Sequence, residues 1–315
     1  MLAHHALDAI GRTPLVRLEA FEPAGGAEIW IKFEAGNPTG SYKDRMAVSV
    51  LRRAMERGAL RRGDRVVEYT GGSTGTALAF ACAVLGLKFT AVFSDAFSES
   101  KKLAMEAFGA QVLVERSDNG AITPELMARM RERARALAAE PGSFYADQFG
   151  SPDVRRGYEP MGVEIADDLG GEVHALIAAV GTGAALMGTA DGLRRAGVEP
   201  AVIALEPLQS PFLTTGKGGP HRVEGIGVGF EPPFLERSRL RDIRAIDQDR
   251  AFAMCRRLAR EAGIFAGGST GLNVVAAIEL AAETGPGKRV VTLGCDNGSK
   301  YLGGHIYRAS DPDRA

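Results

Sequence analysis

Two patterns of hydrophobic and polar residues alternate along the chain. Short, continuously apolar runs are typical of strands that helices cover on both faces, and longer segments with apolar residues three or four positions apart are typical of helices. The apolar runs predict strands at Glu28–Phe33, Arg65–Tyr69, Lys88–Phe93, Gln111–Val114, Val173–Val180, Ala201–Glu206 and Arg289–Leu293. The amphipathic segments predict helices at Asp44–Ala59, Thr74–Leu85, Glu99–Phe108, Pro124–Ala139, Ala184–Arg195, Arg250–Ala262 and Leu272–Thr284.

The order of these elements sets the expected fold class. Strands that alternate with helices build mainly parallel sheets, so we expect an α/β fold. The chain has 315 residues, which is long for one domain and predicts two lobes. The longest segment without either pattern is Leu208–Pro233, which is rich in glycine and proline. A loop of this length inside a compact protein is usually a lid or a binding loop.

Composition and charge exclude several classes of function. The 38 basic and 39 acidic residues give a formal charge of -1, so we expect no surface for nucleic acid or an anionic membrane. The longest apolar run, Ala77–Leu87, is too short to span a bilayer, and residues 1–11 lack the pattern of a signal peptide. Three cysteines, Cys82, Cys255 and Cys295, make no disulfide framework, which favours a cytoplasmic protein. No close Cys/His spacing predicts a metal site.

One lysine lies where a turn leads into a predicted helix. The segment Gly36–Arg45 begins with turn residues, and Lys43 precedes the helix expected from Asp44. The helix macrodipole disfavours a cation at this position, and the neutral amine is the form that makes a Schiff base. Considered alone, Lys43 has the alternative interpretation of a solvated lysine beside a helix cap.

Three glycine-rich turns each lead into a predicted helix. They are Thr70–Gly75, Gly181–Ala185 and Gly267–Gly271, and the first and third share the sequence Gly-Gly-Ser-Thr-Gly. Such a turn presents backbone N–H groups that bind an anion, although a tight turn without a ligand is the alternative at each place. Gly181–Ala185 is not a dinucleotide fingerprint, because Leu186 stands in place of the third glycine.

The segment Asn37–Arg45 resembles the lysine motif of cysteine synthases and cystathionine β-synthases, which use pyridoxal phosphate. Gly11–Leu15, Ile31–Glu34, Ser98–Lys102, Phe108–Val112 and Gly219–Gly227 extend this resemblance over nearly the whole chain. The resemblance implies the two-lobed fold called type II, with the cofactor between the lobes. It places a smaller lobe at residues 45–146 and a larger lobe at residues 1–44 and 147–315.

The same resemblance assigns roles to individual residues. It implies that Lys43 carries the cofactor as a Schiff base and moves the α-proton of the substrate. Cofactor-binding residues would be Lys43, Ser73, Gly181, Thr182, Gly183, Ala184, Ala185 and Ser269, with Ser269 at the pyridine nitrogen and Thr270 as the neighbouring alternative. Residues that bind the substrate carboxylate would be Thr70, Gly71, Gly72, Thr74 and Gln148.

The chain departs from the family pattern at four of these positions. Gly71 and Ser73 stand where the family has serine and asparagine, and Ala184 and Ala185 stand where the phosphate loop has Gly-Thr. Phosphate binding would therefore depend more on backbone donors and on Thr182. A hydroxyl at the pyridine nitrogen, in contrast to a carboxylate, suits loss of a β-substituent better than transamination.

The expected function is therefore a cysteine synthase-like β-replacement or β-elimination on a β-substituted L-amino acid, with O-acetylserine and sulfide giving cysteine. An L-cysteine desulfhydrase or a serine/threonine dehydratase, which release an oxo acid and ammonia, is the first alternative. A catalytically silent protein that binds an amino acid or a partner protein is an alternative of another class. A homodimer is the oligomeric state that the resemblance implies.

Overall fold

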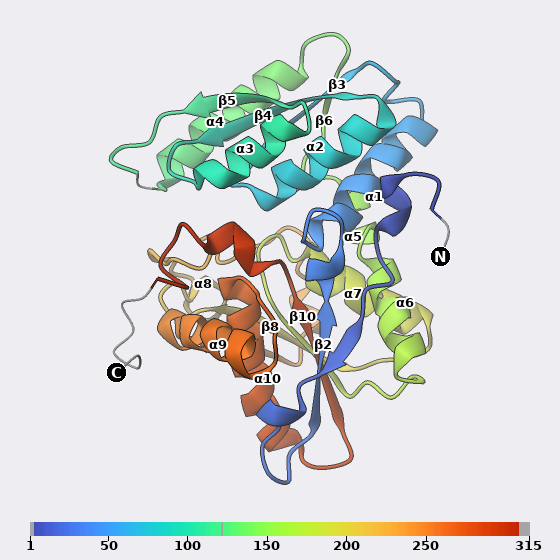
Figure 1. Ribbon diagram of the computed structural model, residues 1–315, viewed down its shortest axis with the longest axis vertical. Coiled ribbons are helices and arrows are strands. Elements are labelled where there is room, and N and C mark those ends of the chain that lie inside the picture. Colours follow the sequence, from blue (N-terminus) through green and yellow to red (C-terminus); the bar gives the residue numbers. More distant parts are fainter. Residues whose placement is uncertain (1–2, 121, 309–315) are drawn as a thin grey trace. The chain divides into compact units, whose positions relative to one another are not determined.

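The computed structural model describes residues 3–120 and 122–308, and within these residues the chain forms two compact units (Figure 1). The first contains the described residues up to Ile10 together with Asn37–Gly157. The second contains Gly11–Gly36 and the described residues from Tyr158 onward. Each unit is built around its own sheet, and helices cover both faces of each. The expected α/β fold class with mainly parallel sheets is confirmed.

The first unit is organised around a parallel four-stranded sheet in the order β5-β4-β3-β6. From β3 the chain moves outward to β4 and β5 and then returns to the other side of β3 as β6. Right-handed crossovers therefore place α2 and α3 on one face of the sheet and α4 on the other, as Figure 1 shows. The strands are β3 (Arg65–Tyr69), β4 (Lys88–Ser94), β5 (Gln111–Glu115) and β6 (Ser143–Tyr145). The helices are η1 (Ala6–Ala9), α1 (Lys43–Glu56), α2 (Ser73–Leu85), α3 (Glu99–Ala107), α4 (Pro124–Ala138) and α5 (Pro152–Arg156).

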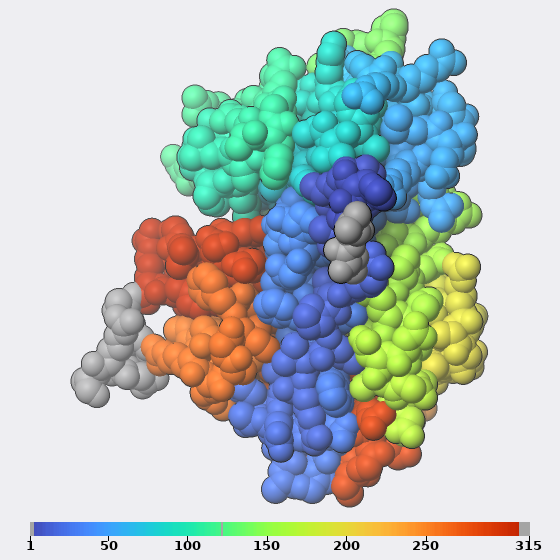
Figure 2. All heavy atoms as spheres, turned by 45° about the vertical axis from the view of Figure 1, so that its right-hand side comes forward, coloured from blue at the N-terminus to red at the C-terminus, as the bar shows by residue number. Residues whose placement is uncertain are grey.

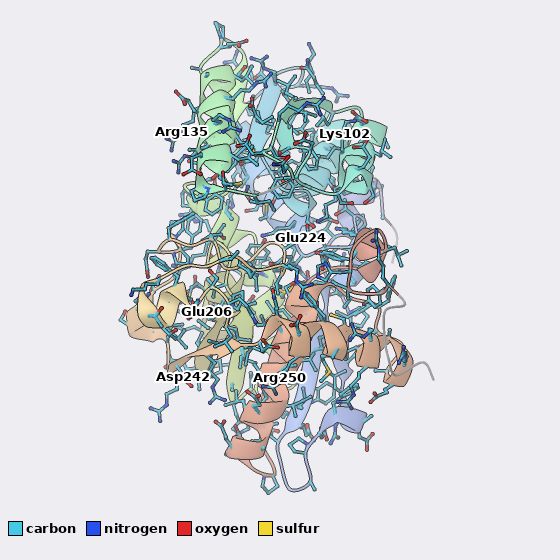
Figure 3. All side chains as sticks on the ribbon, turned by 90° about the vertical axis from the view of Figure 1, so that its left-hand side faces the viewer. Lys102, Arg135, Glu206, Glu224, Asp242 and Arg250 are labelled. Atoms are coloured by element: carbon cyan, nitrogen blue, oxygen red, sulfur yellow. The ribbon has the colours of Figure 1, made fainter. Side chains whose placement is uncertain are left out.

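Charged residues lie on the solvent side of these covering helices. Lys102 of α3 and Arg135 of α4 project away from opposite faces of the sheet (Figure 3). Between the helices, β3 and β4 are almost entirely buried, which explains their continuous apolar sequence.

The second unit is organised around a six-stranded sheet in the order β1-β2-β10-β7-β8-β9. Among these six strands only β1 runs antiparallel to its neighbour. The strands are β1 (Leu15–Arg17), β2 (Glu28–Phe33), β7 (Ala175–Ala179), β8 (Ala201–Pro207), β9 (Asp242–Ile246) and β10 (Arg289–Gly294). The α-helices are α6 (Glu159–Asp168), α7 (Ala184–Arg195), α8 (Phe212–Thr215), α9 (Gln248–Glu261) and α10 (Gly268–Thr284). Single 3-10 turns are η2 (Glu19–Phe21), η3 (Glu34–Gly36), η4 (Arg237–Arg239) and η5 (Gly298–Tyr301).

As in the first sheet, the strand order of the second sheet reverses once along the chain. The chain moves from β7 to β8 and β9 and then returns through α9 and α10 to β10 on the other side of β7. The helices α6 and α7 consequently cover one face, and α9 and α10 cover the other (Figure 1). Its main hydrophobic core lies between α9, α10 and the sheet, and it includes Ile29, Ile177, Ile203 and Val290.

The N-terminal part of the second unit is fastened by buried polar groups. The Thr13 hydroxyl donates to the Glu34 carboxylate at 2.6 Å, and the Lys32 ammonium donates to the Thr13 carbonyl at 2.7 Å. Lys32 also forms an ion pair of 3.0 Å with Glu164 of α6, so the blue N-terminal segment lies beside the green α6 segment in Figure 2. Gly11–Leu15 and Ile31–Glu34, two segments that are separate in the sequence, thus stabilise each other.

Every predicted strand and helix is present, with ends that differ by a few residues. The strands β1, β6 and β9, the α-helices α5, α6 and α8, and the 3-10 helices η1–η5 were not predicted. The first unit also contains residues 3–10, 37–44 and 147–157, which the resemblance placed in the larger lobe; within it, α1 packs against α5. Lys43 therefore lies in the same unit as the loop that follows β3.

In the part of the chain that the structure describes, no helix combines the length and apolar character needed to cross a membrane. Residues 3–120 and 122–308 also contain no group of three or more His, Cys, Asp or Glu side chains placed to bind a metal ion.

Candidate active site

The first candidate site lies where the winding of the first sheet reverses. The chain runs outward from β3 to β4 and β5 and returns to β6 on the other side of β3, and ligands of open α/β sheets bind where the strand order reverses in this way. Thr70–Thr74 follows β3, and Gln148 follows β6. The topology therefore brings these two predicted segments together although the sequence separates them.

The loop after β3 is ordered by the Thr70 side chain. Its hydroxyl oxygen accepts the N–H groups of Gly72 at 3.0 Å and Gly75 at 3.1 Å, which folds the loop into the first turn of α2. Gly72 has a φ of 142°, a conformation that side chains disfavour, and a Cβ atom there would lie 2.2 Å from Lys101. Ser73 is the first residue of α2.

Gln148 is bonded to both ends of this loop. Its amide nitrogen donates to the Tyr69 carbonyl at 3.0 Å, and its amide oxygen accepts the Thr74 hydroxyl at 2.9 Å. The structure thus joins Thr74 and Gln148, two residues that the sequence predicted for the same task.

Gly71 is explained by its neighbour Phe97. A Cβ atom at Gly71 would lie 2.9 Å from Cε1 of Phe97, so the aromatic ring occupies the space that a larger residue would need. Phe97 also packs against Phe93, with the ring centroids 5.5 Å apart. Sequence analysis missed Phe97, because nothing in the local pattern connects it with Gly71.

Lys43 is the first residue of α1, which begins one residue before the predicted helix start at Asp44. Its backbone N–H donates to the Ser41 hydroxyl at 3.2 Å, and its ammonium nitrogen lies 4.8 Å from the centre of the Tyr42 ring. The preceding turn is closed by Asp44, whose carboxylate accepts the N–H of Thr39 at 2.8 Å and also the Thr39 hydroxyl. The motif is therefore one folded turn that fixes the start of α1.

The second candidate site lies at the corresponding switch point of the second sheet, between β7 and β10. Gly181–Gly183 follows β7, and α7 begins at Ala184 without an acidic residue in its first turn. The Thr182 hydroxyl accepts the Ala184 N–H at 3.2 Å. Ala184 is fully buried and Ala185 is partly exposed.

Backbone atoms of Gly225 and Leu235 lie so close to this turn that its glycines have no room for a side chain. A Cβ atom would lie 2.4 Å from the Gly225 carbonyl oxygen if placed on Gly181, and 2.7 Å from the Leu235 nitrogen if placed on Gly183. Gly183 also has a φ of 85°. Both glycines are therefore required by the fold of this turn, whatever it binds.

Ser269 and Thr270 lie in the first turn of α10 and have different surroundings. The Thr270 hydroxyl accepts the backbone N–H of Cys295 at 3.0 Å and is fully buried. Among the described residues the Ser269 side chain makes no hydrogen bond, and 6% of its surface is exposed. The Thr270 hydroxyl is thus already used in a bond within the protein, which favours Ser269 over Thr270 as the residue that could bind a ligand.

A buried amide fastens this end of α10 to the sheet. The Asn273 side chain accepts the N–H of Ala179 in β7 at 2.7 Å and donates to the Leu293 carbonyl in β10 at 2.8 Å. Cys295, next to this amide and buried, serves a packing purpose. Sequence analysis did not single out Asn273; a polar residue inside a strongly apolar helix is the signal that would have found it.

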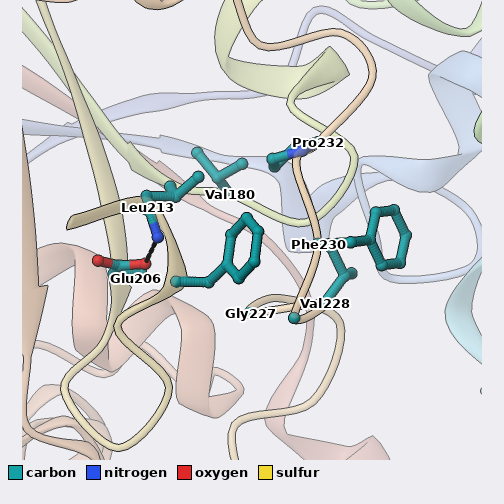
Figure 4. Close-up of a pocket in the computed structure, with 9 residues that line it drawn as sticks. Val180, Glu206, Leu213, Gly227, Val228, Phe230 and Pro232 are labelled. Atoms are coloured by element: carbon teal, nitrogen blue, oxygen red, sulfur yellow. Dashed lines mark hydrogen bonds between the residues drawn. The ribbon is translucent and has the colours of Figure 1, made fainter. Parts of the chain in front are cut away.

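The long loop Leu208–Pro233 packs beside the Gly181 turn and encloses a small apolar pocket (Figure 4). Val180, Leu213, Phe230 and Pro232 line the pocket, and Glu206 anchors its wall by accepting the Leu213 N–H at 2.6 Å. His221 within this loop bonds to the Gly227 carbonyl at 3.1 Å, and burial lowers the pKa of its ring. His221 therefore fixes the loop.

Comparison with known proteins agrees with these features. Residues 6–296 match the family described as pyridoxal-phosphate dependent enzyme. The chain is 36% identical over 306 residues to a cysteine synthase of Staphylococcus aureus, covering 96% of each chain. It is 35% identical over 313 residues to an O-ureido-L-serine synthase of Streptomyces lavendulae, covering 98% of this chain and 94% of that protein.

A solved structure of cysteine synthase (OASS) from Entamoeba histolytica superposes with a TM-score of 0.91 at 31% identity, covering 99% of this chain and 92% of that chain. The chain therefore belongs to the pyridoxal-phosphate dependent enzymes of fold type II. Its cofactor is pyridoxal phosphate, and within the family it is a cysteine synthase-like enzyme.

Proposed function

We propose that Lys43 holds pyridoxal phosphate and that the enzyme exchanges the β-substituent of an L-amino acid, with O-acetylserine and sulfide as the reacting pair. The observation that carries the proposal is the closed turn of residues 37–44, which sets Lys43 at the first position of α1 in a chain similar to cysteine synthases. The roles below rest on this assignment.

The turn Gly181–Ala185 suits the phosphate group of the cofactor. The N-terminus of a helix offers a phosphate dianion several N–H donors, and the first turn of α7 contains no acidic residue that would repel it. Backbone donors are sufficient here because the close packing of Gly225 and Leu235 fixes the turn. The missing hydroxyl at Ala185 leaves Thr182 as the side chain that would add a contact.

Ser269 suits the pyridine nitrogen. Its hydroxyl lies in the first turn of α10, and the neighbouring Thr270 hydroxyl is occupied by Cys295. A neutral hydroxyl does not stabilise a protonated ring nitrogen as a carboxylate would. This weaker electron sink favours departure of a β-substituent over reactions that store charge in the ring.

Thr70–Thr74 and Gln148 suit the carboxylate of the amino acid. They form one hydrogen-bonded unit at a switch point of the first sheet, and α2 begins there without an acidic residue in its first turn. Holding the carboxylate orients the Cα–H bond, and the orientation decides which bond breaks.

When bound, pyridoxal phosphate carries the amino acid covalently through its aldehyde carbon and withdraws electrons from Cα. With the amino acid held in this way, the Lys43 amine would be free, and Lys43 Nζ would be the base that removes the proton from Cα. The bond from Cβ to the leaving group breaks with the electron pair on the leaving group. Sulfide adds to Cβ, and Lys43 Nζ returns the proton to Cα.

The test compares the purified protein and its Lys43→Ala variant. The unaltered enzyme should show the visible absorbance of the lysine-bound cofactor and form cysteine from O-acetylserine and sulfide, and Lys43→Ala should lose both. Lys102→Ala, which removes an exposed ion pair with Glu99 on α3, is the control and should keep both.

Two other outcomes point to the alternatives. Pyruvate and ammonia from L-cysteine, without cysteine formation from O-acetylserine, would favour a desulfhydrase or dehydratase. Absence of visible absorbance in both the unaltered protein and Lys43→Ala would favour a silent binding protein.

We also propose that the protein acts in the cytoplasm as a homodimer. All three cysteines of the chain are buried thiols, which fits a reducing compartment, and the dimer follows from the resemblance to cysteine synthases. Light scattering of the purified protein tests the dimer directly, because a mass near 33.3 kDa would contradict it.

A further inference from the structure

One acidic residue interrupts the apolar strand β3. Glu68 is the fourth of its five residues, and its side chain is fully buried. A buried carboxyl group is costly unless hydrogen bonds satisfy it, so the position of its two oxygen atoms is informative.

The two oxygens bridge the ends of β3 and β6. Oε1 accepts the N–H of Tyr69 at 3.0 Å, and Oε2 accepts the N–H of Gln148 at 2.9 Å. The backbone ladder between the strands ends just before this point, where the Ala146 N–H donates to the Val67 carbonyl at 3.1 Å. The Glu68 side chain therefore continues the connection where backbone pairing stops.

This connection holds a strained turn. Asp147, directly before Gln148, has a φ of 50°, which is uncommon for a residue with a side chain. The Asp147 carbonyl closes the turn by accepting the N–H groups of Gly150 and Ser151 at 3.0 and 2.9 Å. Strain of this kind persists only when surrounding contacts fix it, and Glu68 supplies the contact at Gln148.

We propose that Glu68 is a positioning residue for the substrate carboxylate: by holding the backbone of Gln148, it places the Gln148 amide against Thr74 and the loop after β3. The inference rests on the proposed function, in which this loop and Gln148 bind the carboxylate. Glu68 itself touches neither substrate nor cofactor.

The protonation state of Glu68 gives this role a measurable signature. Burial raises the pKa of Glu68 to about 8, the nearby Asp147 carboxylate adds to the rise, and the two N–H donors oppose it. The other titratable groups facing it are Tyr69 and Tyr145, and Arg131 and Arg135 of α4 act on Tyr69. As the pH rises through this value, a negative charge appears behind the loop and weakens its hold on a carboxylate.

The experiment compares two ligands that differ in the carboxylate. L-Alanine and ethylamine both displace the lysine from the cofactor, neither has a β-leaving group, and only L-alanine carries a carboxylate. Their dissociation constants are measured from the visible spectrum of the holoenzyme, corrected for the free-amine fraction of each ligand. The variant is Glu68→Gln, which keeps the shape but sets an NH2 group against one N–H donor.

We expect Glu68→Gln to keep the visible absorbance, to raise the dissociation constant of L-alanine about tenfold and to change that of ethylamine less than about twofold. Asp153→Asn is the matched control, because Asp153 is a similarly buried carboxylate of the first unit that pairs with Arg57 just after α1. It should leave the ratio of the two constants unchanged. An equal effect of Glu68→Gln on both ligands, or no effect, overturns the inference.

The unaltered enzyme provides a second test, whose main measurement needs no variant. The ratio of the dissociation constant of ethylamine to that of L-alanine should fall between pH 7 and 9. In Glu68→Gln this ratio should stay constant over the same range. A constant preference over this range overturns the inference while leaving the proposed function intact. An unaltered enzyme without any preference for L-alanine overturns the carboxylate site itself, and the inference with it.

Discussion

The hydroxyl of Thr74 donates a hydrogen bond of 2.9 Å to the side-chain oxygen of Gln148, a residue 74 positions further along the chain. This bond joins the first turn of α2 to the turn after β6 at the point where the winding of the first sheet reverses. Because Gln148 also donates to the Tyr69 carbonyl at 3.0 Å, its amide is fixed in orientation before any substrate binds. A preorganised amide of this kind loses little entropy when it binds a carboxylate.

Removing the Thr74 hydroxyl should therefore weaken binding of the amino acid. We expect Thr74→Val, which keeps the volume, to raise the dissociation constant of L-alanine about tenfold, the equivalent of one hydrogen bond. Thr90→Val on β4 is the control, since its hydroxyl bonds to Gln111 on the neighbouring strand. Spectral titration of the holoenzyme measures both, and equal affinities of the two variants would contradict the prediction.

Gly71 and Phe97 should behave as a coupled pair. A serine at position 71 would place Cβ 2.9 Å from the Phe97 ring, so we expect Gly71→Ser to lower the free energy of unfolding by about 1–3 kcal/mol. Phe97→Leu vacates part of that space, so the double variant should lose less than the sum of the single variants. Denaturant unfolding of all four proteins measures the coupling, and simple additivity would show that the ring does not limit position 71.

Gly181 should tolerate no side chain. A methyl group there would lie 2.4 Å from the Gly225 carbonyl oxygen, and its nearest neighbours are backbone atoms, which cannot move aside as a flexible side chain could. We expect Gly181→Ala to reduce affinity for pyridoxal phosphate at least about tenfold, because the turn must shift to relieve the contact. Gly303→Ala, whose Cβ would meet no atom within 4 Å, is the control. Fluorescence titration of the apoenzyme with the cofactor gives both constants.

Asn273 should matter to stability more than its single side chain suggests. Asn273→Ala would leave the Ala179 N–H and the Leu293 carbonyl buried without their partner. We expect a loss of about 3 kcal/mol or more in the free energy of unfolding, since each unsatisfied buried group is costly. Asn297→Ala, which removes a more exposed cap at the start of η5, should cost less. The order of the two losses in denaturant unfolding tests the assignment.

The elements that the sequence predicted share a strong local signal. The continuous apolar runs of β3 and β7 and the periodic pattern of α9 each indicate one structure without reference to the rest of the chain. The shortest of the missed elements lack such a signal. β1 and β6 have three residues each, and α8 has four, so their stability comes from pairing with distant segments.

The candidate site divides in the same way. The turn chemistry before Lys43 and the glycines of the three loops are local, and they were predictable. Phe97, Glu68 and Asn273 were not, because their importance depends on partners that the fold brings in from afar: Gln148 lies 80 residues from Glu68, and Ala179 lies 94 residues from Asn273. The departure at Gly71 likewise depends on a distant residue, because the Phe97 ring occupies the space that a side chain at position 71 would need.

The buried carboxyl of Glu68 should also make stability depend on pH. Its pKa is about 8 in the folded protein, against 4.5 for an exposed glutamate, so the folded state binds the extra proton between these values. The contribution of Glu68 is therefore fully present below about pH 4.5 and is lost as the pH rises towards 8, by at most about 1.4 kcal/mol per pH unit. Glu68→Gln cannot titrate, so its free energy of unfolding relative to the unaltered protein should improve steadily from pH 5 to pH 8. Denaturant unfolding at several pH values measures this difference in unfolding free energy. Titratable groups that both proteins share contribute equally to both and therefore cancel in the difference. A difference that stays constant over the range would mean that Glu68 is already ionised at pH 5 and that its two N–H donors outweigh its burial.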